Sequence, residues 1–234
     1  LVIAVEDRAG NITEPVSLKQ PVLVDTTPPE AEFELSGFSS YGGSYYLSDL
    51  SNLEVKFNVK EDYTSVTAEL RLVSSIDGEP VSNWETDWSK LQQTKLTAGH
   101  SYRIAGRARN AAGGETEVQS EEFTFDDTAP DKLTITLVAS NYPPAPGETV
   151  IFKVEVEEND SPITGCRLAV GNNPGGKELT SKISGHHDGW LSVPLNRLNK
   201  EETIRLTIPG EIPDGDYYPF IEVRNAAGLT STMA

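Results

Sequence analysis

The chain repeats itself, and this repetition limits what it can fold into more than any other feature. Three similar segments contain Gly10, Gly113 and Gly228, which lie 103 and 115 residues apart. A second motif, Asp25-Thr-Thr-Pro-Pro, recurs as Asp127-Thr-Ala-Pro, 102 residues further along. Two motifs that repeat together at nearly the same interval indicate tandem structural units. The sequence therefore predicts modules of about one hundred residues.

The repeat divides the chain into three parts. Residues 1–25 correspond only to the last part of a unit, and match the stretch from about Ile104 to Asp126. Residues 26–127 make one complete unit, and residues 128–234 make a second one. We therefore expect a terminal strand hairpin from a truncated preceding module, followed by two complete domains. A mature N-terminus with an appended hairpin is the alternative.

Each unit has the pattern of short β-strands. Apolar residues alternate with polar ones in matching stretches of the two units, at Leu53, Val55, Phe57 and Val59 and at Val150, Phe152, Val154 and Val156. This period of two is typical of strands with one buried face. Nineteen glycines and fifteen prolines supply turns between the strands. The sequence predicts an all-β fold, and we expect a strand rather than a helical turn at residues 84–91.

A family resemblance begins at Leu96-Thr-Ala-Gly-His-Ser-Tyr102. Together with Asn110-Ala-Ala-Gly, this stretch resembles the fibronectin type III signature of Leu-x-x-Gly, a tyrosine, small apolar residues and Asn-x-x-Gly. The second unit keeps the interval, because Tyr217 precedes Asn225 by eight residues, as Tyr102 precedes Asn110. The resemblance implies a tyrosine corner, in which the ring enters the core and the hydroxyl bonds backbone near the preceding turn.

The joints between units carry a second resemblance. Asp7-Arg-Ala-Gly-Asn followed by Val24-Asp-Thr-Thr-Pro-Pro is similar to the tandem immunoglobulin-like modules of bacterial extracellular proteins. The resemblance implies tandem immunoglobulin-like (fibronectin type III-like) β-sandwiches arranged end to end, in an extracellular or cell-surface protein. Pro28 and Pro29 fix backbone angles at a joint, so we expect a stiff rod. Asn110 and Asn225 depart from the pattern, since the first copy has Asp7 there.

The charge excludes several classes of partner. There are 36 Asp and Glu against 19 Lys and Arg, which gives a net charge of −17. Nucleic-acid binding needs a basic stripe, so the sequence predicts no nucleic-acid partner. The apolar run Leu1–Val5 is far shorter than the ~20 residues of a membrane span, so we expect no membrane insertion.

The sequence shows no catalytic constellation, and we expect no enzyme activity and no cofactor. None of the familiar nucleophile, zinc, phosphate or dinucleotide motifs is present. His186-His187-Asp188 is interpreted as a solvated turn, because neighbouring side chains on an extended segment point in opposite directions. Cys166, the single cysteine, occupies an apolar strand position and is interpreted as an inert core thiol.

Calcium is the one metal worth weighing. Asp25, Asp126 and Asp127 lie at the expected joints, and hard cations prefer several oxygen ligands. Another acidic cluster, at an expected strand end, consists of Glu157, Glu158 and Asp160. No Asp-x-Asp-x-Asp-Gly loop is present, so solvated acids are the alternative to a calcium site at the joint.

These observations favour a non-catalytic spacer or adhesion module of a larger bacterial surface or secreted protein. The alternative is an accessory carbohydrate-binding region of a secreted polysaccharide-degrading enzyme, since sugars stack on exposed aromatic rings. The candidate rings are Tyr41, Tyr45, Tyr46, Trp84, Trp88 and Trp190. A protein or a glycan is accordingly the expected class of partner.

The hairpin of residues 1–24 raises a separate question. An isolated two-stranded hairpin is marginal in water, and Leu1, Ile3 and Val5 would need a surface to cover them. We expect either the first complete unit or a neighbouring chain to provide it. Strand exchange between chains is favoured, with an unpaired edge near the end of the second unit as the acceptor.

Overall fold

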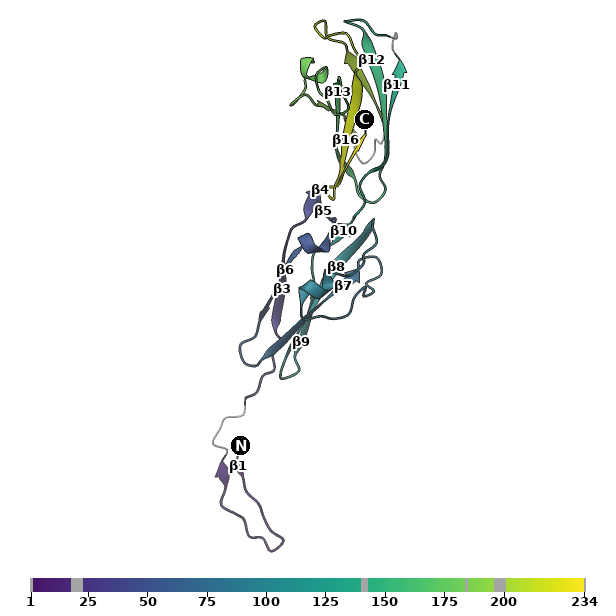
Figure 1. The fold of residues 1–234 in the computed structure, drawn as a ribbon. Helices are drawn as coiled ribbons and strands as arrows, with labels where there is room; N and C mark the ends of the chain where they lie inside the picture. The colour runs from purple at the N-terminus through teal and green to yellow at the C-terminus, as the bar shows by residue number, and fades with distance from the viewer. Residues whose placement is uncertain (1, 18–22, 140–142, 184, 196–200, 234) are drawn as a thin grey trace.

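The computed structural model describes residues 2–17, 23–139, 143–183, 185–195 and 201–233. Figure 1 shows two β-sandwiches placed end to end, with a separate hairpin beyond the first of them. We call the first sandwich module 1 (residues 30–125) and the second module 2 (residues 131–233). Each has its own hydrophobic core. The predicted class, tandem fibronectin type III-like sandwiches arranged end to end, is confirmed; the exact domain boundaries stay a prediction.

Module 2 pairs a three-stranded sheet with a four-stranded sheet. The first contains, in order, β11 (Asp131–Ala139), β12 (Thr149–Glu157) and β15 (Glu201–Thr207), and the second contains β14 (Leu191–Ser192), β13 (Ile163–Gly171), β16 (Tyr218–Asn225) and β17 (Thr230–Met233). The alternation predicted for β12 is confirmed, because Val150, Phe152, Val154 and Val156 are all buried. A short 3-10 turn, η2 (Thr180–Lys182), follows β13.

Module 1 has the same plan with fewer strands in one layer. Its smaller sheet contains only β3 (Glu30–Ser36) and β6 (Glu54–Lys60). The larger sheet contains, in order, β4 (Ser39–Tyr41), β5 (Ser44–Leu47), β10 (Phe123–Phe125), β8 (His100–Asn110) and β7 (Val66–Ser74), with β9 (Glu115–Gln119) also paired to β8. The turn η1 (Leu50–Asn52) precedes β6. The layers pack closely at Gly106, where an added Cβ would lie 2.6 Å from the Phe57 ring.

The strand expected at residues 84–91 is wrong over its second half. Trp88–Leu91 forms a short helix, α1, which directs Leu91 into the core of module 1. The reason is a helix cap: the Asp87 side chain accepts a hydrogen bond from the Ser89 N–H at 2.9 Å. Such a bond satisfies one of the free N–H groups at the start of a helix. Of residues 84–91, only Glu85 bridges to β7, opposite Leu70.

The tyrosine corner is confirmed in both modules. The Tyr102 ring is buried, and its hydroxyl accepts a hydrogen bond from the Thr97 N–H at 2.9 Å. The Tyr217 hydroxyl donates to the Pro213 carbonyl at 3.0 Å. In each case the hydroxyl bonds backbone a few residues upstream, as the resemblance implied.

The hairpin is formed by β1 (Val2–Ile3) and β2 (Val16–Ser17). Cover from the first sandwich, one of the two expectations, is not found among the described residues: Val2 is 63% exposed and Ile3 53% exposed. Its turn nevertheless copies those of the modules. The Gly10 N–H donates to the Asp7 carbonyl, as Gly113 does to Asn110 and Gly228 to Asn225, at 3.0, 3.1 and 3.2 Å.

Candidate functional site: the joint between the modules

The joint contains a buried carboxylate. Asp126 is 0% exposed. Its Oδ1 accepts hydrogen bonds from the Thr128 N–H at 2.9 Å and from the Thr128 hydroxyl at 2.8 Å. Its Oδ2 accepts from the Ser161 hydroxyl and, at 2.8 Å, from Asn225 Nδ2. A buried carboxylate is tolerated only when it is hydrogen-bonded in this way.

Asn225 connects that carboxylate to the rest of module 2. Besides Asp126, its Nδ2 donates to the Thr128 carbonyl at 2.9 Å and to Glu158 Oε2 at 3.4 Å. Its Oδ1 accepts from the Leu229 N–H at 2.9 Å. Glu158 in turn accepts from the backbone N–H groups that follow it, at Asp160 and Ser161. One side chain therefore links the end of β16, the loop after β12 and the segment before β11.

Module 1 repeats this arrangement residue for residue. Asp25 accepts from Thr27, from the Thr64 hydroxyl at 3.0 Å and from Asn110 Nδ2 at 2.9 Å. The same Nδ2 donates to the Thr27 carbonyl at 2.8 Å and to Glu61 Oε2 at 3.1 Å. We call the two sets the module 1 network (Asp25, Thr27, Glu61, Thr64, Asn110) and the module 2 network (Asp126, Thr128, Glu158, Ser161, Asn225).

The networks correct the alignment of the second motif by one residue. Asp25 is equivalent to Asp126 and not to Asp127, because each bonds the threonine two residues later. Pro29 and Pro130, both buried, are then the matching prolines. Two adjacent aspartates at 126 and 127 allowed the slip in the sequence. Asp127 itself is exposed.

Hydrogen bonds perturb the acids of the module 1 network. The Thr27 N–H, followed by the hydroxyls of Thr64 and Thr27, holds the pKa of Asp25 below its ordinary value. The Tyr63 N–H, and then the Asn110 amide, hold the pKa of Glu61 below its ordinary value. Donors that bond the charged form of a carboxyl favour it, which is the physical cause of both shifts.

The backbone of Asp126 is also hydrogen-bonded to module 1. Its backbone N–H donates to the Leu47 carbonyl of β5 at 3.0 Å. Two loops of module 2 lie against the same end of module 1. Asp160 faces Gly99, where an added Cβ would be 2.8 Å from its Oδ1. In the second loop, Ala226 and Ala227 form a buried cluster with Tyr46. Figure 1 shows β4, β5 and β10 at this junction.

The aromatic residues considered for sugar binding do not form an exposed platform. The Trp84 ring contacts Arg71 and Arg107, each with its guanidinium 4.3 Å from the ring centroid. Trp190 is stacked in the same way by Arg167 and Lys177, at 4.3 and 4.8 Å. Both tryptophan rings therefore already form cation–π contacts with side chains of their own module.

The remaining rings are largely inside. Tyr46 is buried, Tyr45 packs against the core of module 1, and the Trp88 indole donates to the Leu53 carbonyl at 3.1 Å. Tyr41 is 38% exposed. A flat sugar-binding face needs several rings open to solvent, and these six residues do not supply one.

The other candidates for chemistry lie apart from the joint. Cys166 is buried, and this burial raises the pKa of its thiol to about 12. His187 and Asp188 are exposed, with 3.4 Å between Nδ1 and Oδ2. Among the described residues, no cluster of three or more His, Cys, Asp or Glu could hold a metal ion. Because Asp25 and Asp126 already accept several hydrogen bonds, calcium at the joints would have to displace those donors; it stays a prediction.

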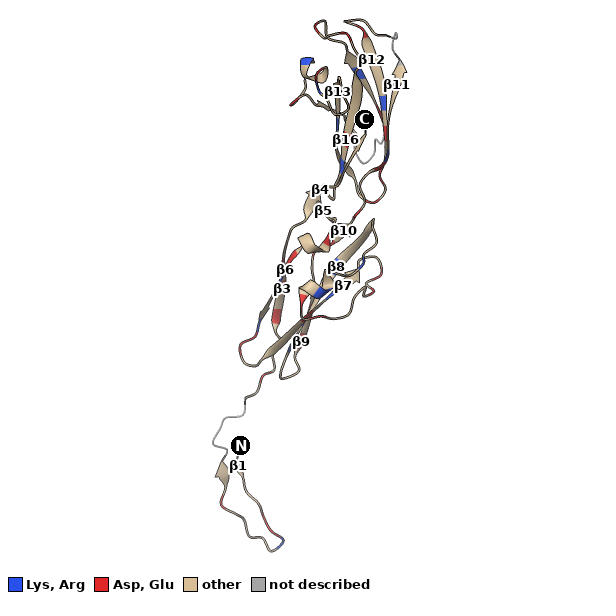
Figure 2. Cartoon of the chain, in the orientation of Figure 1, with Lys and Arg blue, Asp and Glu red and all other residues tan. Residues whose placement is uncertain are grey.

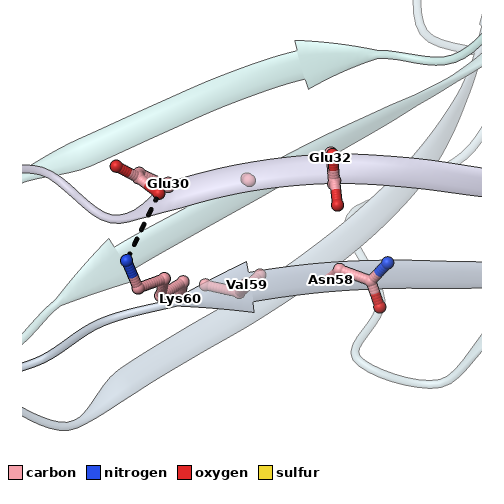
Figure 3. A pocket seen from close by; sticks show the side chains of 6 residues that line it. Glu30, Glu32, Asn58, Val59 and Lys60 are labelled. Carbon is pink, nitrogen blue, oxygen red and sulfur yellow. Dashed lines mark ion pairs between the residues drawn. The ribbon is translucent and has the colours of Figure 1, made fainter.

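Charged residues are distributed along the whole chain, as Figure 2 shows. Figure 3 shows a shallow hollow between β3 and β6, lined by Glu30, Glu32, Asn58 and Lys60. Glu30 and Lys60 form an exposed ion pair at 3.8 Å, a type that contributes little to stability.

In the part of the chain that the structure describes, no helix is long and apolar enough to cross a membrane.

A scan against models of protein families finds no match, and neither does a search of curated proteins. Among solved structures, the chain is similar to the FN1–FN3 domains of chicken CNTN1, with 12% sequence identity and a TM-score of 0.33. The similarity covers 99% of this chain and 76% of that one. The strand order and register of the two modules define the fold.

Proposed function

We propose that this chain is a non-catalytic spacer or adhesion segment of a larger extracellular or cell-surface protein of bacterial type. The observation that carries the proposal is Asp126, whose backbone is bonded to module 1 and whose side chain is bonded to module 2. A residue shared between two sandwiches leaves no free linker at the joint. The chain then holds its two ends at a fixed separation, which is what a spacer must do.

The burial at the joint supports the same conclusion. Ala226 and Ala227 are 4% and 7% exposed because they pack on Tyr46 of module 1. Domains whose contact is small and polar move freely relative to each other. Here apolar contact and a buried network act together, so we expect one preferred orientation of the modules.

Distance measurements between spin labels test this proposal. Labels at Ile76→Cys and Glu211→Cys place one probe on each module at exposed positions, and the buried Cys166 stays unlabelled. We expect a single narrow distance distribution. Ala227→Glu should broaden it, because a carboxylate would enter the contact with Tyr46.

Ala112→Glu is the matched control, since Ala112 is the equivalent of Ala227 in module 1 and is exposed. It should leave the distribution unchanged. A broad distribution in the unsubstituted chain would contradict a rigid spacer.

A further inference from the structure

One strand of module 1 lacks a neighbour that its counterpart in module 2 has. In module 2, β12 pairs with β11 on one side and, over seven residue pairs, with β15 on the other. In module 1, β6 pairs with β3 alone. No backbone hydrogen bond joins Glu54–Lys60 to any described residue outside β3. The outer edge of β6 is therefore an open sheet edge, which is a template for another strand.

The gap lies within module 1 itself. Residues 75–99 have the place in the chain order that β14 and β15 have in module 2, and the structure describes all of them. They contain α1 and two isolated bridges to β7, but no strand. Two of their side chains bond the residues just before β6. Trp88 Nε1 donates to the Leu53 carbonyl at 3.1 Å, and Gln92 Nε2 donates to the Leu50 carbonyl at 3.4 Å.

The inward side chains of β6 are less covered than those of β12. Val55, Phe57 and Val59 are half-buried. Glu61 and Glu158 are equivalent residues of the two networks, so the counterparts of these three side chains lie 97 residues further along, and all three are buried. Apolar surface that is partly open at a sheet edge gains free energy when another apolar strand covers it.

The sequence of β6 is complementary to itself. Its seven residues have apolar side chains at the second, fourth and sixth positions and opposite charges at the two ends. When two copies run antiparallel with Phe57 at the centre, Val55 lies opposite Val59, and Glu54 lies opposite Lys60. All seven residues are then paired, and each apolar side chain meets an apolar one. Opposite charges that face each other across two strands are stabilising.

Other registers of the same two strands are less favourable. A shift by one residue places apolar side chains opposite polar ones. A shift by two residues places Lys56 opposite either Lys56 or Lys60 of the other copy, and like charges in these positions are destabilising. A shift by four leaves only three pairs. The register centred on Phe57 is therefore the one that the sequence of β6 favours.

We propose that β6 pairs antiparallel with β6 of a second copy of this chain, about a two-fold axis at Phe57. The two smaller sheets become one sheet in the order β3, β6, β6, β3, and main-chain hydrogen bonds provide the affinity. On the outer face, Lys60 of one copy lies between Glu54 of the other and its own Glu30, its partner in the ion pair of Figure 3. Because β6 runs along the length of module 1 (Figure 1), the two rods point in opposite directions.

Disulfide trapping between two full-length variants tests the register. The proposed pairing places Lys56 of one copy opposite Asn58 of the other, on the exposed face of the sheet. Mixing the Lys56→Cys chain with the Asn58→Cys chain under mild oxidation should give a mixed disulfide, which mass spectrometry identifies. Both pairs of Glu54 with Lys60 stay intact in these variants.

Glu32→Cys in place of Asn58→Cys is the matched control. Glu32 is exposed and lies opposite Asn58 on β3. It is therefore two strands away from Lys56 of the other copy, about 9–10 Å, which is too far for a disulfide. This mixture should give no mixed disulfide.

Sedimentation equilibrium of full-length charge variants provides the second arm. The unsubstituted chain should form a dimer as its concentration rises. Glu54→Lys should weaken association at least about tenfold, because both pairs with Lys60 in the dimer become pairs of like charge. Adding Lys60→Glu to this variant should restore association, since opposite charges again face each other. Glu32→Lys makes the same change of charge one strand away from the edge and should leave association unchanged.

Three results would overturn the proposal. The first is a monomer at all concentrations. The second is a dimer that Glu54→Lys does not weaken, or that Glu32→Lys weakens equally. The third is a mixed disulfide that forms as readily with Glu32→Cys as with Asn58→Cys. None of these results would affect the proposed spacer function, which rests on the joint between the modules.

Discussion

The two networks have the same hydrogen bonds in different surroundings. The module 2 network is at the joint, where Asp126 is fully buried and Ala227 is 7% exposed. The module 1 network is at the opposite end, where Asp25 is half-exposed and Ala112 is exposed. Tyr63, the counterpart of Asp160, is 63% exposed. The comparison teaches that a neighbouring module, and not the motif itself, decides how far these polar groups are removed from water.

Burial should change how much each of these equivalent hydrogen bonds contributes to the stability of its module. A hydrogen bond to a charged group contributes more than a neutral one, and removing its partner in the interior adds the cost of a desolvated charge. At a water-exposed site, solvent replaces the lost donor. Equivalent substitutions in the two networks therefore measure what the joint adds.

Asn225→Ala should give the largest effect. It removes one of the donors to Asp126 and the Nδ2 donor to the Thr128 carbonyl, and the carboxylate stays buried. We expect module 2 to lose about 3 kcal/mol of unfolding free energy. Urea denaturation, monitored by amide hydrogen exchange in each module, measures this loss of unfolding free energy.

Asn110→Ala is the matched substitution in module 1, and it should cost about 1–2 kcal/mol because Asp25 is half-exposed and water can replace the lost donor. Equal losses in the two modules would show that the joint does not strengthen the network.

The two tyrosine corners give a smaller contrast. Tyr102→Phe removes the hydroxyl from a buried ring and leaves the Thr97 N–H without its partner, so module 1 should lose about 1.5 kcal/mol. Tyr217→Phe should cost about 0.5 kcal/mol, since that ring is only half-buried. Thermal unfolding of the two variants decides the order, and a larger loss for Tyr217→Phe would contradict it.

Much of this organisation could be predicted from the sequence. The repeat predicted two modules, and the resemblance to the fibronectin type III signature implied both tyrosine corners. The two asparagines were recognised only as motif residues, because their partners Glu61 and Glu158 come from loops about fifty residues or more away. A signal was present: each glutamate precedes a hydroxyl residue by three positions, Thr64 or Ser161. Nothing in the pattern showed that module 1 would lack a counterpart of β15.

Acid should lower the stability of module 1 through the module 1 network, and the effect should be modest. The folded pKa values of Asp25 and Glu61 lie below their ordinary values of 3.8 and 4.5. Their stabilisation is therefore complete above the unfolded pKa values and is lost as the pH falls through the lower, folded values. We expect the melting temperature of module 1 to fall on acidification below about pH 4.5. Calorimetry should show a shallower fall for Asp25→Asn, and an unchanged slope would contradict the role of Asp25.

The double membership of Asp126 has a consequence for how the chain folds. The module 2 network is complete only when the Asp126 side chain is in place, and the Leu47 carbonyl holds its backbone once β5 has formed. A folded module 1 therefore lowers the entropy cost of assembling module 2. Stability in an array of such units is then a sum of unit and nearest-neighbour contributions. In this chain the neighbour contribution is shared equally by the two modules, and module 1 is the first of them to be synthesised.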